Sequence, residues 1–101
     1  MNKLIFNERT GKWIEYPPYP CKMCGQYEVQ HGHDICNICG WQDDGVQNAD
    51  RDFWGGANKL NYNQYKIIWQ NNKEQIMQAD FAYKFELIEK ITTQAKKDGF
   101  I

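Results

Sequence analysis

Two cysteine pairs constrain the fold of this chain more than any other feature. Residues 21–25 and 36–40 each read Cys-x-x-Cys-Gly. Two residues between cysteines let both sulfur atoms converge on one ion from a tight turn, and the following glycine can adopt the left-handed conformation, so that backbone N–H groups point at the thiolates. Tetrahedral zinc takes four such ligands at about 2.3 Å. The sequence therefore predicts one structural zinc ion, held by Cys21, Cys24, Cys36 and Cys39.

Other uses of the four cysteines are weaker alternatives. The N-terminal segment resembles no signal peptide, so we expect a cytoplasmic protein, and structural disulfides are rare in that reducing compartment. A redox-active site would need one pair only, whereas two pairs that are each followed by glycine indicate a closed site. Iron could occupy an identical four-sulfur cage. A site closed by four thiolates has no open position, so we expect the ion to be structural and not catalytic.

Size and charge narrow the classes of function. With 101 residues, the chain is expected to form a single domain, 1–101, with the zinc ribbon at about 19–41 embedded in it. A domain this small has a marginal core, and a bound metal is a common remedy. The net charge of −1 provides no general excess of Lys and Arg for non-specific binding of nucleic acid. No stretch approaches the length needed to cross a membrane.

The sequence predicts a mixed α+β fold that begins with a hairpin. Apolar residues at 4–6 and 13–16 flank a polar turn at 8–11, which predicts a β-hairpin over residues 3–16. Three prolines at 17–20 predict a stiff, extended connection into the ribbon. Within the ribbon we expect a second hairpin, with 27–30 leading out, 34–35 leading back and 31–33 at the tip. Residues 42–59 show no clear period and are expected to form an ordered loop.

Two helices are expected to complete the fold. Asn61 and Gln64 form a capping box for a short helix, which ends near Asn71-Asn72 and presents its apolar residues on one face (Tyr65, Ile68 and Trp69). A long helix is predicted over 73–97, ending before Gly99. Its apolar stripe follows helical spacing at Met77, Phe81, Phe85, Ile88, Ile91 and Ala95. We expect this stripe to pack on the hairpin and ribbon; the alternative is that part of it binds a partner.

The central half of the chain resembles the bacterial cysteine-rich CPCC family. The resemblance covers about 19–69 and rests on Tyr19-Pro20-Cys21, Cys24-Gly25 and the blocks 34–39, 41–47 and 55–60, in this order and spacing. It implies a small zinc-ribbon-like protein. Lys22 and Met23 stand where the family has Pro and Cys, but both outer cysteines are present. The predicted hairpin before Tyr19 and the last helix lie outside the resemblance.

Residues 41–58 contain the other candidate sites. Their acidic and aromatic side chains form a candidate partner-binding surface of Trp41, Asp43, Asp44, Asp50, Asp52 and Trp54. The plainer interpretation is that the aspartates cap turns and that Trp41 packs over the ribbon, and a second metal at the aspartates is a further alternative. Residues 55–58 could form a backbone nest for an anion, although a simple turn is the plainer interpretation. His31 and His33 are expected at an exposed hairpin tip.

These features favour a binding protein over an enzyme. The chain has no Ser, and no cysteine outside the two pairs, so no nucleophile with an obvious base is found. We expect a non-enzymatic protein that acts through protein–protein binding, such as an immunity protein that inhibits a bacterial toxin. The main alternative is a nucleic-acid-binding zinc ribbon, whose lysines would share one face (Lys22, Lys59, Lys66 and Lys73). A third is an enzyme with a second metal at Asp43-Asp44.

Overall fold

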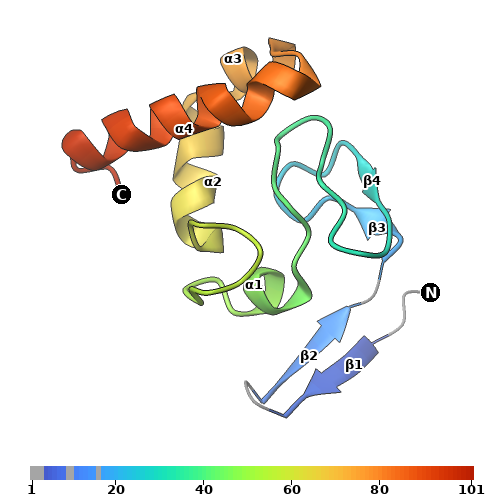
Figure 1. Ribbon diagram of the computed structural model, residues 1–101. Helices are drawn as coiled ribbons and strands as arrows, with labels where there is room; N and C mark the ends of the chain where they lie inside the picture. Colours follow the sequence, from blue (N-terminus) through green and yellow to red (C-terminus); the bar gives the residue numbers. More distant parts are fainter. Residues whose placement is uncertain (1–3, 9–10, 16) are drawn as a thin grey trace.

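The computed structural model describes residues 4–8, 11–15 and 17–101. Its elements, in chain order, are β1 (Leu4–Asn7), β2 (Lys12–Glu15), β3 (Tyr19–Pro20), β4 (Glu28–Val29), α1 (Gly45–Ala49), α2 (Tyr62–Asn71), α3 (Lys73–Gln78) and α4 (Phe81–Lys97). Figure 1 shows the β1–β2 hairpin at one end of the molecule, the ribbon, α1 and α2 in the middle, and α3 and α4 at the other end. The predicted mixed α+β class is confirmed.

The predicted N-terminal hairpin is present. β1 and β2 pair antiparallel, with Phe6 opposite Trp13 and Ile5 opposite Ile14. The rings of Phe6 and Trp13 meet edge to face at 5.2 Å on one side of the hairpin. Ile14 lies against α1 so closely that a Cβ atom at Gly45 would fall 2.2 Å from its Cγ2 atom. The predicted limits Lys3 and Tyr16, and positions 9–10 of the turn, lie outside the described residues.

The strand pairing inside the ribbon differs from the prediction. β3 pairs antiparallel with β4, so Tyr19 faces Val29, and Ile35 forms an isolated antiparallel bridge with Gln42. Because of these two pairings, each cysteine pair lies at the turn of its own short hairpin. The connection between the N-terminal hairpin and β3 includes a cis bond between Pro17 and Pro18. The expected hairpin between the pairs, with 34–35 returning along 27–30, is wrong, because the partner of residues 28–29 precedes the first cysteine.

The segment 42–59 contains a helix that the sequence analysis missed. α1 begins after Asp44, whose side chain accepts hydrogen bonds from the backbone N–H groups of Val46 (2.9 Å) and Gln47 (3.2 Å). A side-chain oxygen that accepts from the first free N–H groups is the usual way to start a helix. α1 spans only five residues, which is too short for an apolar period to be visible in the sequence.

α2 agrees with the prediction. Asn61 accepts a hydrogen bond from the Gln64 backbone N–H at 2.8 Å, and the Gln64 side chain accepts from the Asn61 N–H at 3.1 Å. Three side chains of its inner face, Tyr65, Ile68 and Trp69, are buried as expected. The helix ends at Asn71, and Asn72 is its C-cap. The capping box therefore fixes the start of the helix that covers the ribbon.

The predicted long helix is two helices. The backbone is extended at Ala79 (ψ 137°) and Asp80 (ψ 146°), which separates α3 from α4, and the chain ends its last helix before Gly99 (φ +80°) as predicted. The break separates Met77 on α3 from the other members of the expected stripe, which lie on α4, and the stripe is wrong in its first half. Ile88 is buried, and Ile91 and Ala95 pack partly on the core, but three members are 40–45% exposed (Met77, Phe81 and Phe85). Lys84 and Ile76 are buried instead.

Trp41 is the centre of the core between the ribbon and α2. Its side chain is fully buried, and its ring meets Tyr62 at 5.7 Å and Tyr65 at 5.1 Å, both edge to face. The packing of Trp41 over the ribbon is thereby confirmed. Edge-to-face pairs add about 0.5–1.5 kcal/mol each to the burial of their area. In the part of the chain that the structure describes, no helix is long and apolar enough to cross a membrane.

Candidate metal centre

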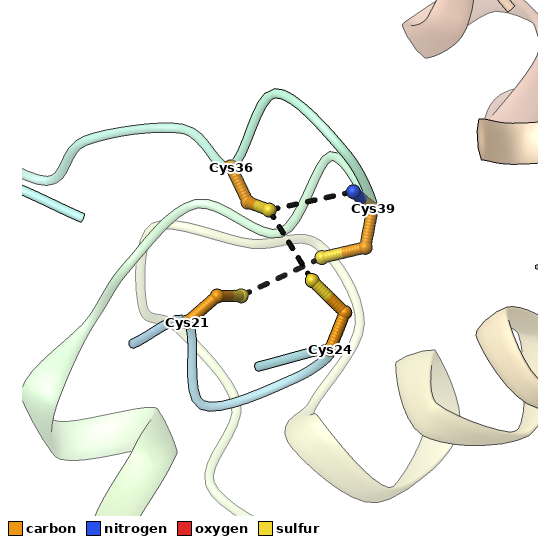
Figure 2. A group of neighbouring side chains, drawn as sticks. All are labelled: Cys21, Cys24, Cys36 and Cys39. Atoms are coloured by element: carbon orange, nitrogen blue, oxygen red, sulfur yellow. Dashed lines mark hydrogen bonds between the residues drawn. The ribbon is translucent and has the colours of Figure 1, made fainter. Parts of the chain in front are cut away.

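Two matching turns present the cysteines. In the first, the Cys21 N–H donates to Tyr27 O (2.7 Å) and the Gly25 N–H donates to Cys21 O (2.8 Å). In the second, the Cys36 N–H donates to Trp41 O and the Gly40 N–H donates to Cys36 O, both at 2.9 Å. Both glycines are left-handed, with φ of +71° and +81°. This shared turn places the two sulfur atoms of each pair on the same side, and Figure 2 shows the two pairs facing each other.

The four sulfur atoms have the spacing of a tetrahedral metal site. All Sγ atoms lie within 4.8 Å of one another. Cys21 Sγ is 3.6 Å from Cys39 Sγ, and Cys24 Sγ is 3.5 Å from Cys36 Sγ. Four bonds of about 2.3 Å at tetrahedral angles would separate the sulfur atoms by about 3.8 Å, whereas a disulfide needs about 2.0 Å. The predicted ligands are therefore brought together in a geometry that fits a metal ion and not two disulfides.

The sulfur atoms also share protons and backbone donors. Hydrogen bonding with Cys21 lowers the pKa of Cys24 to about 7 and lowers the pKa of Cys36. The same bonds raise the pKa of Cys21 and Cys39. Backbone N–H groups of Met23, Ile38 and Cys39 lie 3.4 Å from Sγ atoms, the first at Cys21 and the other two at Cys36. Four close sulfur atoms cannot all ionise by themselves, so a cation is what would let the set bind as thiolates.

The helices hold both turns through three hydrogen bonds that the sequence analysis missed. Tyr62 Oη donates to Lys22 O at 2.5 Å, and Tyr65 Oη donates to Cys39 O at 2.7 Å. From α4, Lys84 Nζ donates to Ile38 O at 2.9 Å. Burial, and then the Cys39 thiolate, raise the pKa of Tyr65. Lys84 shares one helical face with Ile88, Ile91 and Ala95, but its bond to Ile38 O joins residues 46 positions apart, and no local pattern in the sequence contains that contact.

The comparison with known families agrees with this geometry. The family described as Cysteine-rich CPCC matches residues 19–73. The chain belongs to this family. No curated protein and no solved structure matches the chain. Membership and the four-cysteine cluster together make this a metal-binding domain. The family match includes β3, both turns, α1 and α2, and it leaves the β1–β2 hairpin and α4 outside.

Two blocks that carry the family resemblance, 41–47 and 55–60, bind each other. Asn58 Nδ2 donates to Gln42 O at 2.8 Å, and the Gln42 N–H donates to Asn58 Oδ1 at 3.0 Å, so the amide side chain pairs like a strand. Gln47 is fully buried; its Oε1 accepts from the Asn58 N–H at 3.1 Å, and its Nε2 donates to Leu60 O at 3.2 Å. In this family member, these polar residues therefore form an internal scaffold beside the metal site.

The predicted partner surface needs correction at three of its residues. Trp41, Asp43 and Asp44 are buried. Asp43 accepts hydrogen bonds from Tyr19 Oη (2.8 Å) and Asn48 Nδ2 (2.8 Å), and burial raises the pKa of its carboxyl group. These three side chains are held inside and cannot present a contact surface.

The other predicted partner residues lie nearer the solvent. Asp52 and Trp54 are exposed, and Asp50 is half-buried after α1. A surface that includes Asp50, Asp52 and Trp54 stays a prediction.

The alternative of an anion nest at 55–58 is not supported, because a carboxylate of the chain already binds this turn. Asp44 Oδ2 accepts a hydrogen bond from the Ala57 N–H at 2.9 Å, and a Cβ atom at Gly56 would lie 2.6 Å from the same oxygen. The chain therefore supplies its own carboxylate to this turn. Among the described residues, the four cysteines form the only group of three or more His, Cys, Asp or Glu side chains close enough to share an ion. The alternative of a second metal at Asp43-Asp44 is not supported.

The remaining polar candidates are spread over different contacts. His31 and His33 are exposed, as expected, and His33 Nδ1 lies 3.0 Å from Asp43 O. Lys22 pairs with Glu15 at 2.6 Å and lies over the Tyr19 ring, and Lys66 lies over the Tyr62 ring. Two of the four lysines that a nucleic-acid-binding surface would use, Lys22 and Lys66, thus contact side chains of the protein itself. That alternative stays a prediction.

Proposed function

We propose that the four cysteines hold one structural zinc ion and that the chain is a non-enzymatic protein that acts by binding another protein. The sulfur spacing, the four-thiol ligand set and the N–H groups near the sulfur atoms support zinc. Thiols that must stay reduced to bind metal suit the cytoplasm. The four cysteines fill all four coordination positions of the ion, so we assign the ion no catalytic step.

One surface feature carries the proposal of protein binding. Met77, Phe81 and Phe85 are 43%, 45% and 40% exposed, and the Phe81 and Phe85 rings meet edge to face at 5.2 Å. Beside Phe85 lies a groove of about 400 Å³ between α4, the second cysteine turn and residues 57–60. Its apolar wall includes Ile35, Tyr65, Phe85 and Ile88. Exposed aromatic rings that contact each other next to a groove, as Phe81 and Phe85 do, are typical of surfaces that bind proteins.

The partner that we propose is a bacterial toxin, with this chain as its immunity protein. A chain of 101 residues with a net charge of −1, no Ser, and every cysteine used in the metal site is suited to a stable binding scaffold. In this account the metal and the internal polar network fix the central domain, and the exposed face of α3 and α4 contacts the toxin. The mixed apolar and charged rim of the groove (Lys59, Glu89 and Lys96) would orient the partner.

The test is recovery of a partner by the zinc-loaded, tagged chain from its native host. We expect one stoichiometric protein that is encoded by a neighbouring gene, is toxic when expressed alone and is neutralised when this chain is co-expressed. Recovery of RNA or ribosomal material, with no such protein, would contradict the proposal and favour the nucleic-acid alternative.

Two matched variants locate the surface. Phe81→Ser with Phe85→Ser removes exposed rings from α4, and Trp54→Ser removes a ring that is 66% exposed in the loop after α1. We expect the α4 variant to lose the partner and protection against the toxin, while both variants keep zinc and a cooperative thermal transition. If only Trp54→Ser loses the partner, the surface around Asp50, Asp52 and Trp54 is the correct one.

A further inference from the structure

Lys84 is a buried cation whose purpose the proposed function does not explain. Its side chain is only 1% exposed, although lysine is almost never fully buried without a partner. It lies on α4, beyond the part of the chain that matches the family. Its Nζ atom donates to two backbone carbonyl oxygens, Ile38 O at 2.9 Å and Ile76 O, the latter in α3. Two neutral carbonyl groups accept from two of its three N–H donors, and among the residues that the structure describes no carboxylate pairs with its charge.

The Ile38 carbonyl connects Lys84 to a metal ligand. This oxygen belongs to the peptide unit between Ile38 and Cys39, whose N–H lies 3.4 Å from Cys36 Sγ. A cation at the oxygen of a peptide unit polarises its N–H and makes it a better donor, so the two hydrogen bonds strengthen each other. Lys84 therefore reaches the Cys36 sulfur through one peptide unit. A stronger N–H donor stabilises the thiolate form, which is the form that binds metal.

The charge of the metal site supplies the missing partner. Four thiolates and one divalent cation carry a net charge of −2. Such a charge in a buried site is costly unless an opposite charge lies nearby. Burial lowers the pKa of the Lys84 ammonium group, and the interaction with the thiolates of Cys36, Cys39 and Cys24 opposes this and favours the charged form.

We infer that Lys84 is a positioning and charge-compensating residue of the metal centre, which acts through the Ile38–Cys39 peptide unit and makes docking of α4 depend on the metal. The inference rests on the proposed occupancy by zinc. It assigns to α4, outside the family match, a part in a site whose ligands all lie inside the match. Loss of the ion would leave the buried ammonium without its countercharge and weaken the contact between α4 and the second turn.

The first test compares zinc affinity by competition with a chelator. Lys84→Met removes the charge and keeps an unbranched apolar chain. Lys90→Met is the control, because Lys90 is exposed on the same helix and contacts Glu86 at 3.7 Å and the Tyr83 ring. We expect Lys84→Met to bind zinc about 10- to 100-fold more weakly, the usual effect of removing a group that supports a ligand. We expect no change for Lys90→Met. Equal affinity of Lys84→Met and the wild type would overturn the inference.

A double-mutant cycle separates charge from simple anchoring. Cys24 is the least buried ligand, and Cys24→His lowers the net charge of the site from −2 to −1. If Lys84 compensates charge, Lys84→Met should cost clearly less zinc affinity in the Cys24→His background than in the wild type. An identical loss in both backgrounds would show that Lys84 only anchors the turn. A wild-type chain that binds no zinc would instead refute the proposed occupancy.

A measurement on the wild type does not depend on how the variants fold. The nitrogen NMR signal of the Lys84 side chain distinguishes an ammonium group from a neutral amine. In the zinc-loaded protein at neutral pH we expect an ammonium signal whose protons exchange slowly with water. A neutral amine at this position in the zinc-loaded protein would overturn the inference.

Discussion

At the scale of single residues, the metal centre depends on a few atoms in special positions. The left-handed glycines after each cysteine pair were predicted from the sequence, because the motif itself requires them. Lys84 was not predicted, because a lysine in an apolar stripe is normally assigned to the solvent. Its burial follows from a carbonyl group 46 positions earlier in the chain, and no local pattern contains that information.

The two glycines provide a matched pair of variants. A Cβ atom at Gly40 would lie 2.7 Å from Ile88 Cδ1 and 3.0 Å from Tyr65 Oη, whereas at Gly25 it would meet nothing within 4 Å. At either position alanine would have to adopt the left-handed backbone conformation, which costs about 1–2 kcal/mol of stability. We expect Gly25→Ala to lose that amount and Gly40→Ala clearly more, about 3 kcal/mol in total. Urea unfolding of the zinc-loaded proteins measures both, and equal losses would contradict the close packing around Gly40.

Tyr19 predicts a dependence of stability on alkaline pH. Burial, and then its hydrogen bond to Asp43, raise the pKa of the phenol above the value of about 10 in the unfolded chain. The folded state therefore holds this proton more tightly, so stability is full below pH 10 and falls as the pH rises above it, by about 1.4 kcal/mol per pH unit for one proton. Between pH 9 and 11, we expect the free energy of unfolding of the Tyr19→Phe variant to fall less steeply with pH than that of the wild type, as measured by denaturant unfolding. The same slope for both would refute the assignment.

At the scale of elements, local signals were reliable and long-range pairing was not. The capping box at Asn61 and Gln64 fixed the start of α2, because each hydrogen bond joins neighbours along the chain. The pairing of β3 with β4 was missed, because the strands are two residues long and carry no alternation. The break at Ala79–Asp80 was missed because neither Gly nor Pro marks it. The partner surface was misassigned at Asp43 and Asp44 because acidic side chains were taken as exposed.

The buried amide of Gln47 is expected to hold the 53–60 segment. Its side chain bonds Asn58 through Oε1 and the carbonyl oxygens of Phe53, Asn58 and Leu60 through Nε2. Gln47→Ala leaves buried groups unpaired, at about 1–3 kcal/mol for such a group. We expect a loss of about 3 kcal/mol in the free energy of unfolding.

The matched control for Gln47 is an exposed glutamine. Gln70→Ala, on the outer face of α2, should change stability by less than about 0.5 kcal/mol. Thermal or urea unfolding at saturating zinc compares the two variants. A loss for Gln47→Ala no larger than that of the control would show that the network contributes little.

At the scale of the whole molecule, the metal joins parts that are distant in the sequence. Three of the four cysteines belong to the buried core, together with Trp41 and the inner residues of α2. Helices α2 and α4 contact the cysteine turns through hydrogen bonds from Tyr62, Tyr65 and Lys84. The ligand set was predicted from the sequence because spacing alone defines it. The supporting contacts depend on tertiary structure and were visible only in the fold.

Removal of the metal is therefore expected to unfold the central part of the chain, which contains the ribbon. Binding of a structural zinc ion contributes on the order of 10 kcal/mol, which is comparable to the whole net stability of a small domain. We expect a strong chelator, under reducing conditions, to abolish the cooperative thermal transition and much of the helical circular dichroism. Return of both signals on addition of zinc is the control for irreversible damage. A chelated protein with an unchanged melting temperature would contradict a structural role.

Native mass spectrometry of the intact chain, purified under reducing conditions without added metal, measures whether the four cysteines hold zinc. We expect one zinc ion per folded chain and no zinc in a Cys36→Ala, Cys39→Ala variant. A folded wild-type chain that carries no metal, with four free thiols or two disulfides, would contradict this expectation.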